Sequence, residues 1–237
     1  MENNYGFLST RFYRLMEWIW RFAYLNILWL VFTLLGLGIF GVFPATASAY
    51  SVIRKWLIKD PDTAIFSVFW SSYKAHFLGA NSLGYCLIVM GYILYFNYNY
   101  LAVISGFEHT FVLFFWFITV AIYLLLVLFL FPVYVHYQLK FLQYFKAAIW
   151  VAVANPLALI SMILGLIIGS YLFRFIPGLI PFFSVSILLS LIMWNAVHAF
   201  ERIKRKKQRL ANNEDSLIFR TRQLKEKISS ATRSIND

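Results

Sequence analysis

Charged residues are scarce in this sequence. Only 13% of its 237 residues are Asp, Glu, Lys or Arg, whereas 61% are hydrophobic, and the mean hydropathy is +0.70. A soluble domain has about a quarter charged residues. Five long stretches hold no charged side chain: 22–53, 77–107, 110–139, 147–173 and 175–200. Because a bilayer core needs about 20 apolar residues per helix and offers the backbone no partners, this composition predicts an all-α, polytopic transmembrane helical bundle.

Cysteine and the motifs of common enzyme classes are also missing. The only cysteine, Cys86, lies inside an apolar stretch, which excludes a disulfide framework and a thiolate metal cluster. The sequence has no G-x-x-x-x-G-K loop, no H-E-x-x-H and no carboxylates or histidines at ligand spacing. No charged residue lies in a predicted span, which argues against proton relays and acid-base catalysis within the membrane. We therefore expect a protein that is not an enzyme and binds no cofactor or metal.

The net charge of +11 is concentrated towards the C-terminus. Eleven of the 21 Lys and Arg residues lie in 201–237, against five acidic residues. Clusters next to a span attract anionic lipid headgroups and also fix the orientation of the span. We therefore expect a lipid bilayer with anionic headgroups as the partner, and no nucleic acid. The basic residues expected at the membrane surface are Arg54, Lys55, Arg202, Lys204, Arg205, Lys206, Lys207 and Arg209.

The positions of Lys and Arg also predict orientation, because basic residues near span ends are retained in the cytoplasm. Segments 54–76, 136–155 and 201–237 hold 17 of them, whereas 102–109 holds only Glu108 and 174–177 only Arg174. We therefore expect a multi-pass protein of a bacterial plasma membrane with a cytoplasmic C-terminus.

The stretch 22–53 leaves the number of crossings at five or six. A single crossing would place the three arginines before residue 22 outside the cell. Two short crossings, from about Trp18 to Gly36 and over 39–53, would keep them inside, with a turn at Gly36–Gly38. However, 39–53 has only 15 residues, about 22 Å, so a re-entrant element stays open. We favour six crossings with both termini inside.

The later elements are predicted at 77–101, 110–135, 156–173 and 178–199. Asn155-Pro156 is typical of a helix start, with Asn155 as cap and Pro156 in the first turn. Residues 139–153 would then form an amphipathic helix on the inner membrane surface. The resulting organisation is a cytoplasmic N-terminal segment at 1–17, a transmembrane domain at 18–200 and a basic cytoplasmic tail at 201–237.

Polar residues within the spans are the candidates for a site. Asparagines at depth can line a pathway, or they can join helices at about 0.6 kcal/mol per hydrogen bond, which we favour. Proline inside the membrane frees backbone groups and kinks helices, and small neighbours allow close packing. The candidate packing or pathway residues are Asn26, Pro44, Ala45, Thr46, Ala47, Asn81, Asn155, Pro156 and Asn195.

Phe43-Pro44-Ala45-Thr46-Ala47, followed by Arg54-Lys55-Trp56, resembles the hallmark of the YesL-like family of bacterial membrane proteins. The resemblance covers roughly residues 10–200, including 26–29, 69–74 and the Asn155-Pro156 region, although Phe43 stands where many relatives have Gly. It implies a small polytopic protein of Gram-positive type bacteria. Relatives are often encoded beside carbohydrate ABC importers and polysaccharide-degrading enzymes, and no catalytic residue comes with the resemblance.

These observations lead to three hypotheses. The first is a non-enzymatic accessory component of oligosaccharide ABC import that packs against the importer permease. The second is a stand-alone facilitator whose pathway is lined by Asn26, Ser48, Asn81 and Asn195. The third is a membrane sensor or scaffold that acts through the basic tail.

Overall fold

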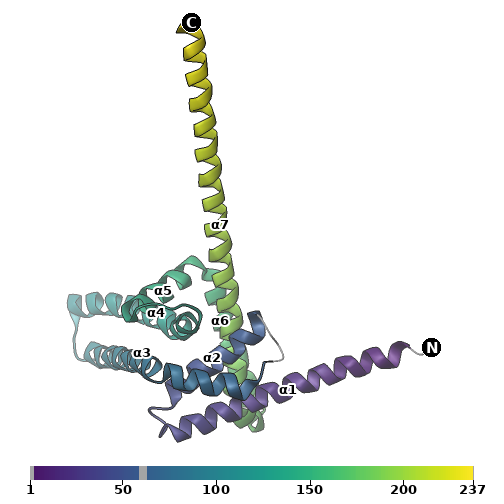
Figure 1. Ribbon diagram of the computed structural model, residues 1–237. Coiled ribbons are helices and arrows are strands. Elements are labelled where there is room, and N and C mark those ends of the chain that lie inside the picture. The colour runs from purple at the N-terminus through teal and green to yellow at the C-terminus, as the bar shows by residue number, and fades with distance from the viewer. Residues whose placement is uncertain (1–2, 59–62, 237) are drawn as a thin grey trace. The chain divides into compact units, whose positions relative to one another are not determined.

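The chain folds almost entirely into helices. A computed structural model describes the backbone of residues 3–58 and 63–236 and the side chains of 12–58 and 63–212. The side chains of Arg11 and Lys59, which the predicted orientation uses, lie outside the described residues. No strand occurs in the described part, and the predicted all-α class is confirmed (Figure 1). The elements are α1 (Asn3–Leu35), α2 (Val42–Ile58), α3 (Ile65–Leu101), α4 (Gly106–His136), α5 (Phe141–Ala154), α6 (Pro156–Phe175), the 3-10 helix η1 (Pro177–Leu179) and α7 (Ile180–Asn236).

Five segments of the described chain are long and apolar enough to cross a bilayer: Phe12–Leu35, Ile65–Leu101, Gly106–His136, Pro156–Phe175 and Pro177–Asn212. Helix α2 has 17 residues, about 26 Å, and α5 has 14. Both are shorter than the roughly 20 residues that a full crossing requires. The chain is therefore a multi-pass helical membrane protein with two shorter helices.

Several helices extend beyond their predicted starts. Helix α1 begins at Asn3 rather than near Trp18, and α3 begins at Ile65 rather than at 77. Hydropathy reports only the part of a helix that lipid surrounds, whereas backbone hydrogen bonds continue the helix into more polar sequence. The apolar pattern therefore predicts the presence of these helices better than their first residues.

The predicted turn between α1 and α2 is present and depends on glycine. Leu37 and Gly38 have φ angles of +57° and +73°, in the left-handed region that glycine adopts readily. The chain also folds back tightly, because a Cβ on Gly41 would lie 2.4 Å from the carbonyl oxygen of Thr33. Only a residue without a side chain fits there without a backbone shift.

The predicted boundary between α5 and α6 is right, but the predicted cap is wrong. Asn155 occupies the N-cap position and Pro156 is the first residue of α6. The Asn155 side chain, however, does not cap α6. Its Nδ2 donates to the carbonyl oxygen of Val151 at 3.0 Å, so it satisfies a carbonyl at the end of α5.

The chain forms two compact units, residues 1–197 and 198–237. Helix α7 contributes to both. In the second unit, Arg205 pairs with Glu201 one turn earlier at 3.1 Å. The six basic side chains of its first turns are exposed: Arg202, Lys204, Arg205, Lys206, Lys207 and Arg209.

Helix α2 lies at the centre of the first unit. It contacts α1, α3 and α4, and α5 contacts α4 and α6. Helices α3 and α4 lie side by side (Figure 1). They are antiparallel, because Gly79 faces Tyr134 whereas Gly91 faces Tyr123. The core is therefore built around a short helix that its longer neighbours cover.

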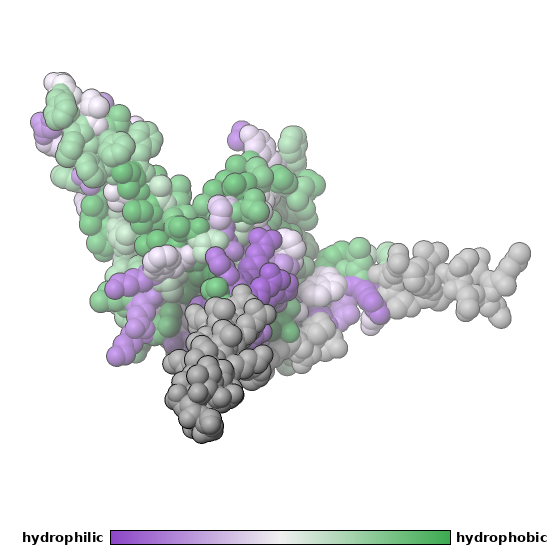
Figure 2. Space-filling view, turned by 90° about the horizontal axis from the view of Figure 1, so that it is seen from above, coloured by the Kyte–Doolittle hydropathy of each residue, from purple (hydrophilic) through white to green (hydrophobic). Residues whose placement is uncertain are grey.

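The long helices leave large apolar side chains uncovered. Leu78, Phe107 and Phe175 are each at least 80% exposed. Figure 2 shows hydrophobic residues over most of the coloured surface in its view. Soluble monomers rarely expose continuous apolar patches beyond a few hundred Å². Lipid solvates such a surface without the hydrophobic cost that water imposes.

Candidate functional site

The first half of α2 is buried and carries small side chains. Ala45, Ala47 and Ser48 have no exposed surface. The Ser48 hydroxyl donates to the carbonyl oxygen of Pro44 at 2.7 Å, so its polar group is satisfied within the helix. Because these side chains are short, the helices around α2 can approach its backbone closely.

Two contacts hold this segment in place. The Thr46 hydroxyl donates to the carbonyl oxygen of Val42 at 2.7 Å and accepts the indole N–H of Trp29 on α1 at 3.0 Å. Towards α3, the Phe43 ring lies over Gly84, where an added Cβ would come within 2.2 Å of the ring. A hydrogen bond to α1 and a ring seated on a glycine of α3 therefore fix α2.

Pro44 lies in the first turn of α2, which begins at Val42, and a proline in the first turn does not interrupt the helix. It does free a backbone group, because residue 44 of a regular helix would donate to the carbonyl of Phe40 and proline has no N–H. Asn81 of α3 supplies the missing donor: its Nδ2 lies 3.0 Å from that carbonyl oxygen.

Helix α3 also binds the rest of the turn. Carbonyls at helix ends and in turns often lack intrahelical donors, and lipid offers none. The Phe32 carbonyl at the end of α1 accepts the N–H of Gly36 at 3.1 Å as well as a side-chain donor from α3. Three α3 side chains, spaced so that they share one helix face, donate to main-chain carbonyls: Tyr73 to Phe32 (3.1 Å), Asn81 to Phe40 (3.0 Å) and Tyr85 to Ile39 (3.3 Å). We call these three side chains the α3 clamp.

Asn26 of α1 binds the beginning of α7 within the first unit. Its Nδ2 donates to the carbonyl oxygen of Pro181 at 2.7 Å. Its Oδ1 accepts the N–H groups of Val185 at 3.0 Å and Ser186 at 3.1 Å. In a regular helix, residue 185 donates to residue 181. The amide therefore binds both groups of a hydrogen bond that a regular helix makes.

Asn195 joins α7 to α6. Its Oδ1 accepts the hydroxyl hydrogen of Ser161, and its Nδ2 donates to the carbonyl oxygen of Leu191 at 3.0 Å. Among the hydrogen bonds of the described residues, none joins two of the four side chains assigned to a pathway. Nor do the described residues contain a group of three or more His, Cys, Asp or Glu that could hold a metal ion.

A second polar group lies where α2 and α4 end. The Nε of Arg54 donates to Nδ1 of His136 at 3.2 Å. Burial lowers the pKa of Arg54 below its usual value, but a guanidinium stays charged in proteins. On α4, the Tyr134 hydroxyl lies 3.1 Å from Nδ1 of His76 on α3, and its ring packs edge-on against Tyr144 of α5. Sequence reasoning missed the Arg54–His136 pair, because no local pattern links residues so far apart in the chain.

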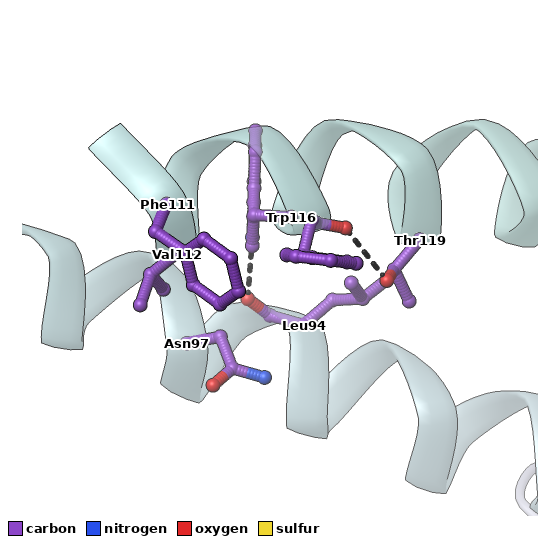
Figure 3. Close-up of a pocket in the computed structure, with 7 residues that line it drawn as sticks. Leu94, Asn97, Phe111, Val112, Trp116 and Thr119 are labelled. Atoms are coloured by element: carbon purple, nitrogen blue, oxygen red, sulfur yellow. Dashed lines mark hydrogen bonds between the residues drawn. The ribbon is translucent and has the colours of Figure 1, made fainter. Parts of the chain in front are cut away.

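A groove of about 260 Å³ lies between α3 and α4 (Figure 3). The indole N–H of Trp116 donates to the carbonyl oxygen of Leu94 at 3.1 Å, and the Thr119 hydroxyl donates to that of Phe115 at 2.9 Å. Most polar groups of the groove are thus engaged with the backbone, and the walls are apolar. The lining residues are Leu94, Asn97, Phe111, Val112, Phe115, Trp116 and Thr119.

Most of this sequence is similar to that of known proteins. It is 38% identical over 184 residues to the uncharacterized protein YteU of Bacillus subtilis (strain 168), covering 75% of this chain and 80% of that protein. It is 36% identical to the uncharacterized protein YesV (78% and 89% covered) and 32% identical to the uncharacterized protein YesL (74% and 82% covered), both of the same organism. The chain belongs to the YesL-like family. No solved structure matches it.

A family model described as a protein of unknown function, DUF624, matches residues 22–98. That range holds the second part of α1, the turn, the whole of α2 and the α3 clamp. It also includes Asn26 and Arg54, whereas His136 lies beyond it. The range that the family model matches thus includes the α1–α2 turn and the groups that bind it.

Proposed function

We propose that this YesL-like protein is a non-enzymatic accessory component that packs in the membrane against the permease of an oligosaccharide ABC importer. The family resemblance suggests the permease as partner, since relatives are often encoded beside such importers. The arrangement of polar groups supports a packing role. Asn26, Asn81 and Asn195 are each engaged in hydrogen bonds with the chain itself.

The observation that carries the proposal is the uncovered surface of two long helices. In the most apolar 18-residue windows of α4 and α6, only 11% and 17% of the residues are buried inside the chain. The small-residue face of α2 is already covered by α1, α3 and α4, so a partner has to dock elsewhere. Exposed phenylalanines on α4 offer the aromatic contact area that interfaces favour: Phe107, Phe111, Phe114, Phe115 and Phe117.

Site-specific crosslinking tests the proposal. A photoreactive amino acid is placed at Phe114, which is 62% exposed, or at the matched control Phe129, which is fully buried on the same helix. Cells of the native bacterium are irradiated and the crosslinked products are identified by mass spectrometry. We expect an importer permease subunit to be crosslinked from position 114 and not from position 129. Products at position 114 that contain only lipid or a second copy of this chain would contradict the proposal.

A further inference from the structure

Arg54 is a partly buried cation. No Asp or Glu among the described residues forms an ion pair with it. The ion pairs found among the described side chains join Arg21 to Glu17 and Arg205 to Glu201. The group that binds Arg54 is the neutral ring nitrogen Nδ1 of His136. Burying a charge is unfavourable unless an opposite charge compensates for it. An anionic ligand at Arg54 would supply this compensation.

The hydrogen-bond geometry specifies the kind of anion. A guanidinium carries five N–H donors, and His136 accepts the one on Nε. The two terminal NH₂ groups make no hydrogen bond to the described residues. Their planar, forked arrangement matches two oxygens of a phosphate or carboxylate group. His136 binds the guanidinium from one edge and so acts as a positioning residue for the fork.

The location favours a lipid headgroup as the source of the phosphate. Arg54 directly follows the uncharged stretch 22–53, and His136 is the last residue of α4, so both lie where hydrophobic segments end. Tyr134 and Tyr144 lie nearby and Lys55 is exposed, as is typical of the membrane interface. Basic pockets between membrane helices on the cytoplasmic side bind anionic headgroups.

We propose that Arg54, oriented by His136 between the ends of α2 and α4, binds the phosphate of an anionic phospholipid headgroup. This site is distinct from the diffuse attraction of the basic tail, because it consists of one forked donor held by a neighbouring side chain. It is also independent of a permease partner, so it can be tested on the purified protein alone.

Native mass spectrometry of the full chain tests the site. The protein is purified in detergent with equal amounts of phosphatidylglycerol and phosphatidylcholine, and the lipids that remain bound are counted. The wild type should retain phosphatidylglycerol selectively. Arg54→Gln should bind it about tenfold more weakly, since a charge-assisted hydrogen bond is lost. Arg174→Gln is the matched control: it makes the same chemical change at an exposed arginine outside the predicted headgroup-binding set and should leave the tightly bound lipid in place.

Thermal unfolding in nanodiscs provides the second readout. Phosphatidylglycerol should raise the melting temperature of the wild type, compared with phosphatidylcholine, but not that of Arg54→Gln. If Arg54→Gln does not fold, Arg54→Lys replaces it, and this variant should bind phosphatidylglycerol more weakly because the fork is lost. Equal lipid retention by the wild type and the Arg54 variant would overturn the proposal. Equal stabilisation by inorganic phosphate in phosphatidylcholine nanodiscs would overturn the assignment to lipid.

Discussion

At the scale of single residues, several asparagine side chains of this protein form hydrogen bonds with main-chain groups outside their own helix. Pro44 leaves the Phe40 carbonyl without its helical donor, and Asn81 provides one from another helix. The sequence singled out both residues, because proline and asparagine are conspicuous in apolar surroundings. It could not show that they serve the same carbonyl, since their link depends on how α2 packs against α3.

The link between Asn81 and Pro44 predicts a specific coupling. Asn81→Leu leaves the Phe40 carbonyl without a donor and should lower the free energy of unfolding by about 1–3 kcal/mol. In a Pro44→Ala background, the new N–H of residue 44 can donate to that carbonyl, so the same substitution should cost less. Thermal unfolding of the four proteins in detergent forms a double-mutant cycle that measures the difference.

A matched control is available on the same helix. Asn99 is exposed, and among the described residues its side chain donates to the carbonyl oxygen of Tyr95 on its own helix, so Asn99→Leu should change stability by less than about 0.5 kcal/mol. An equal cost of Asn81→Leu with and without Pro44 would show that the amide does not act through the Phe40 carbonyl.

At the scale of elements, the α3 clamp fixes the depth of the α1–α2 turn. Asn81 and Tyr85 lie about 30 and 24 Å along α3 from its last residue, Leu101. The turn at 36–41 is therefore not level with the loop 102–105. From this offset and the short length of α2 we predict that 39–53 re-enters the membrane, an alternative that the sequence left open. Hydropathy predicted the turn but not its depth, because it reports segment length and not position against a neighbour.

The offset predicts a difference in labelling from outside the cell. Single cysteines are placed at Ser105 or Ile39 in a Cys86→Ser background, and intact cells are treated with a membrane-impermeant maleimide. We expect Ser105→Cys to be labelled and Ile39→Cys to be protected, because the turn lies within the depth of α3. After denaturation in detergent both should react. Equal labelling at the two positions in intact cells would contradict the offset.

At the scale of the whole molecule, lipid exposure explains why so much of the fold could be predicted. Charge exclusion acts on every residue of a span and is visible locally, so the apolar stretches indicated where the long helices lie. The central position of α2 was not visible, because Ala45 and Ala47 look alike whether they face lipid, a partner or their own chain. The contact between Arg54 and His136 was also hidden, because no local pattern links residues so far apart in the chain.

The central claim is that lipid surrounds the long helices, and alkaline extraction of membranes tests it most directly. Membranes that contain the full chain are washed in sodium carbonate at high pH and sedimented, with a peripheral and an integral protein as controls. We expect the chain to stay in the pellet with the integral control and to be released only by detergent. Release into the alkaline supernatant as a folded, monomeric protein would contradict the account.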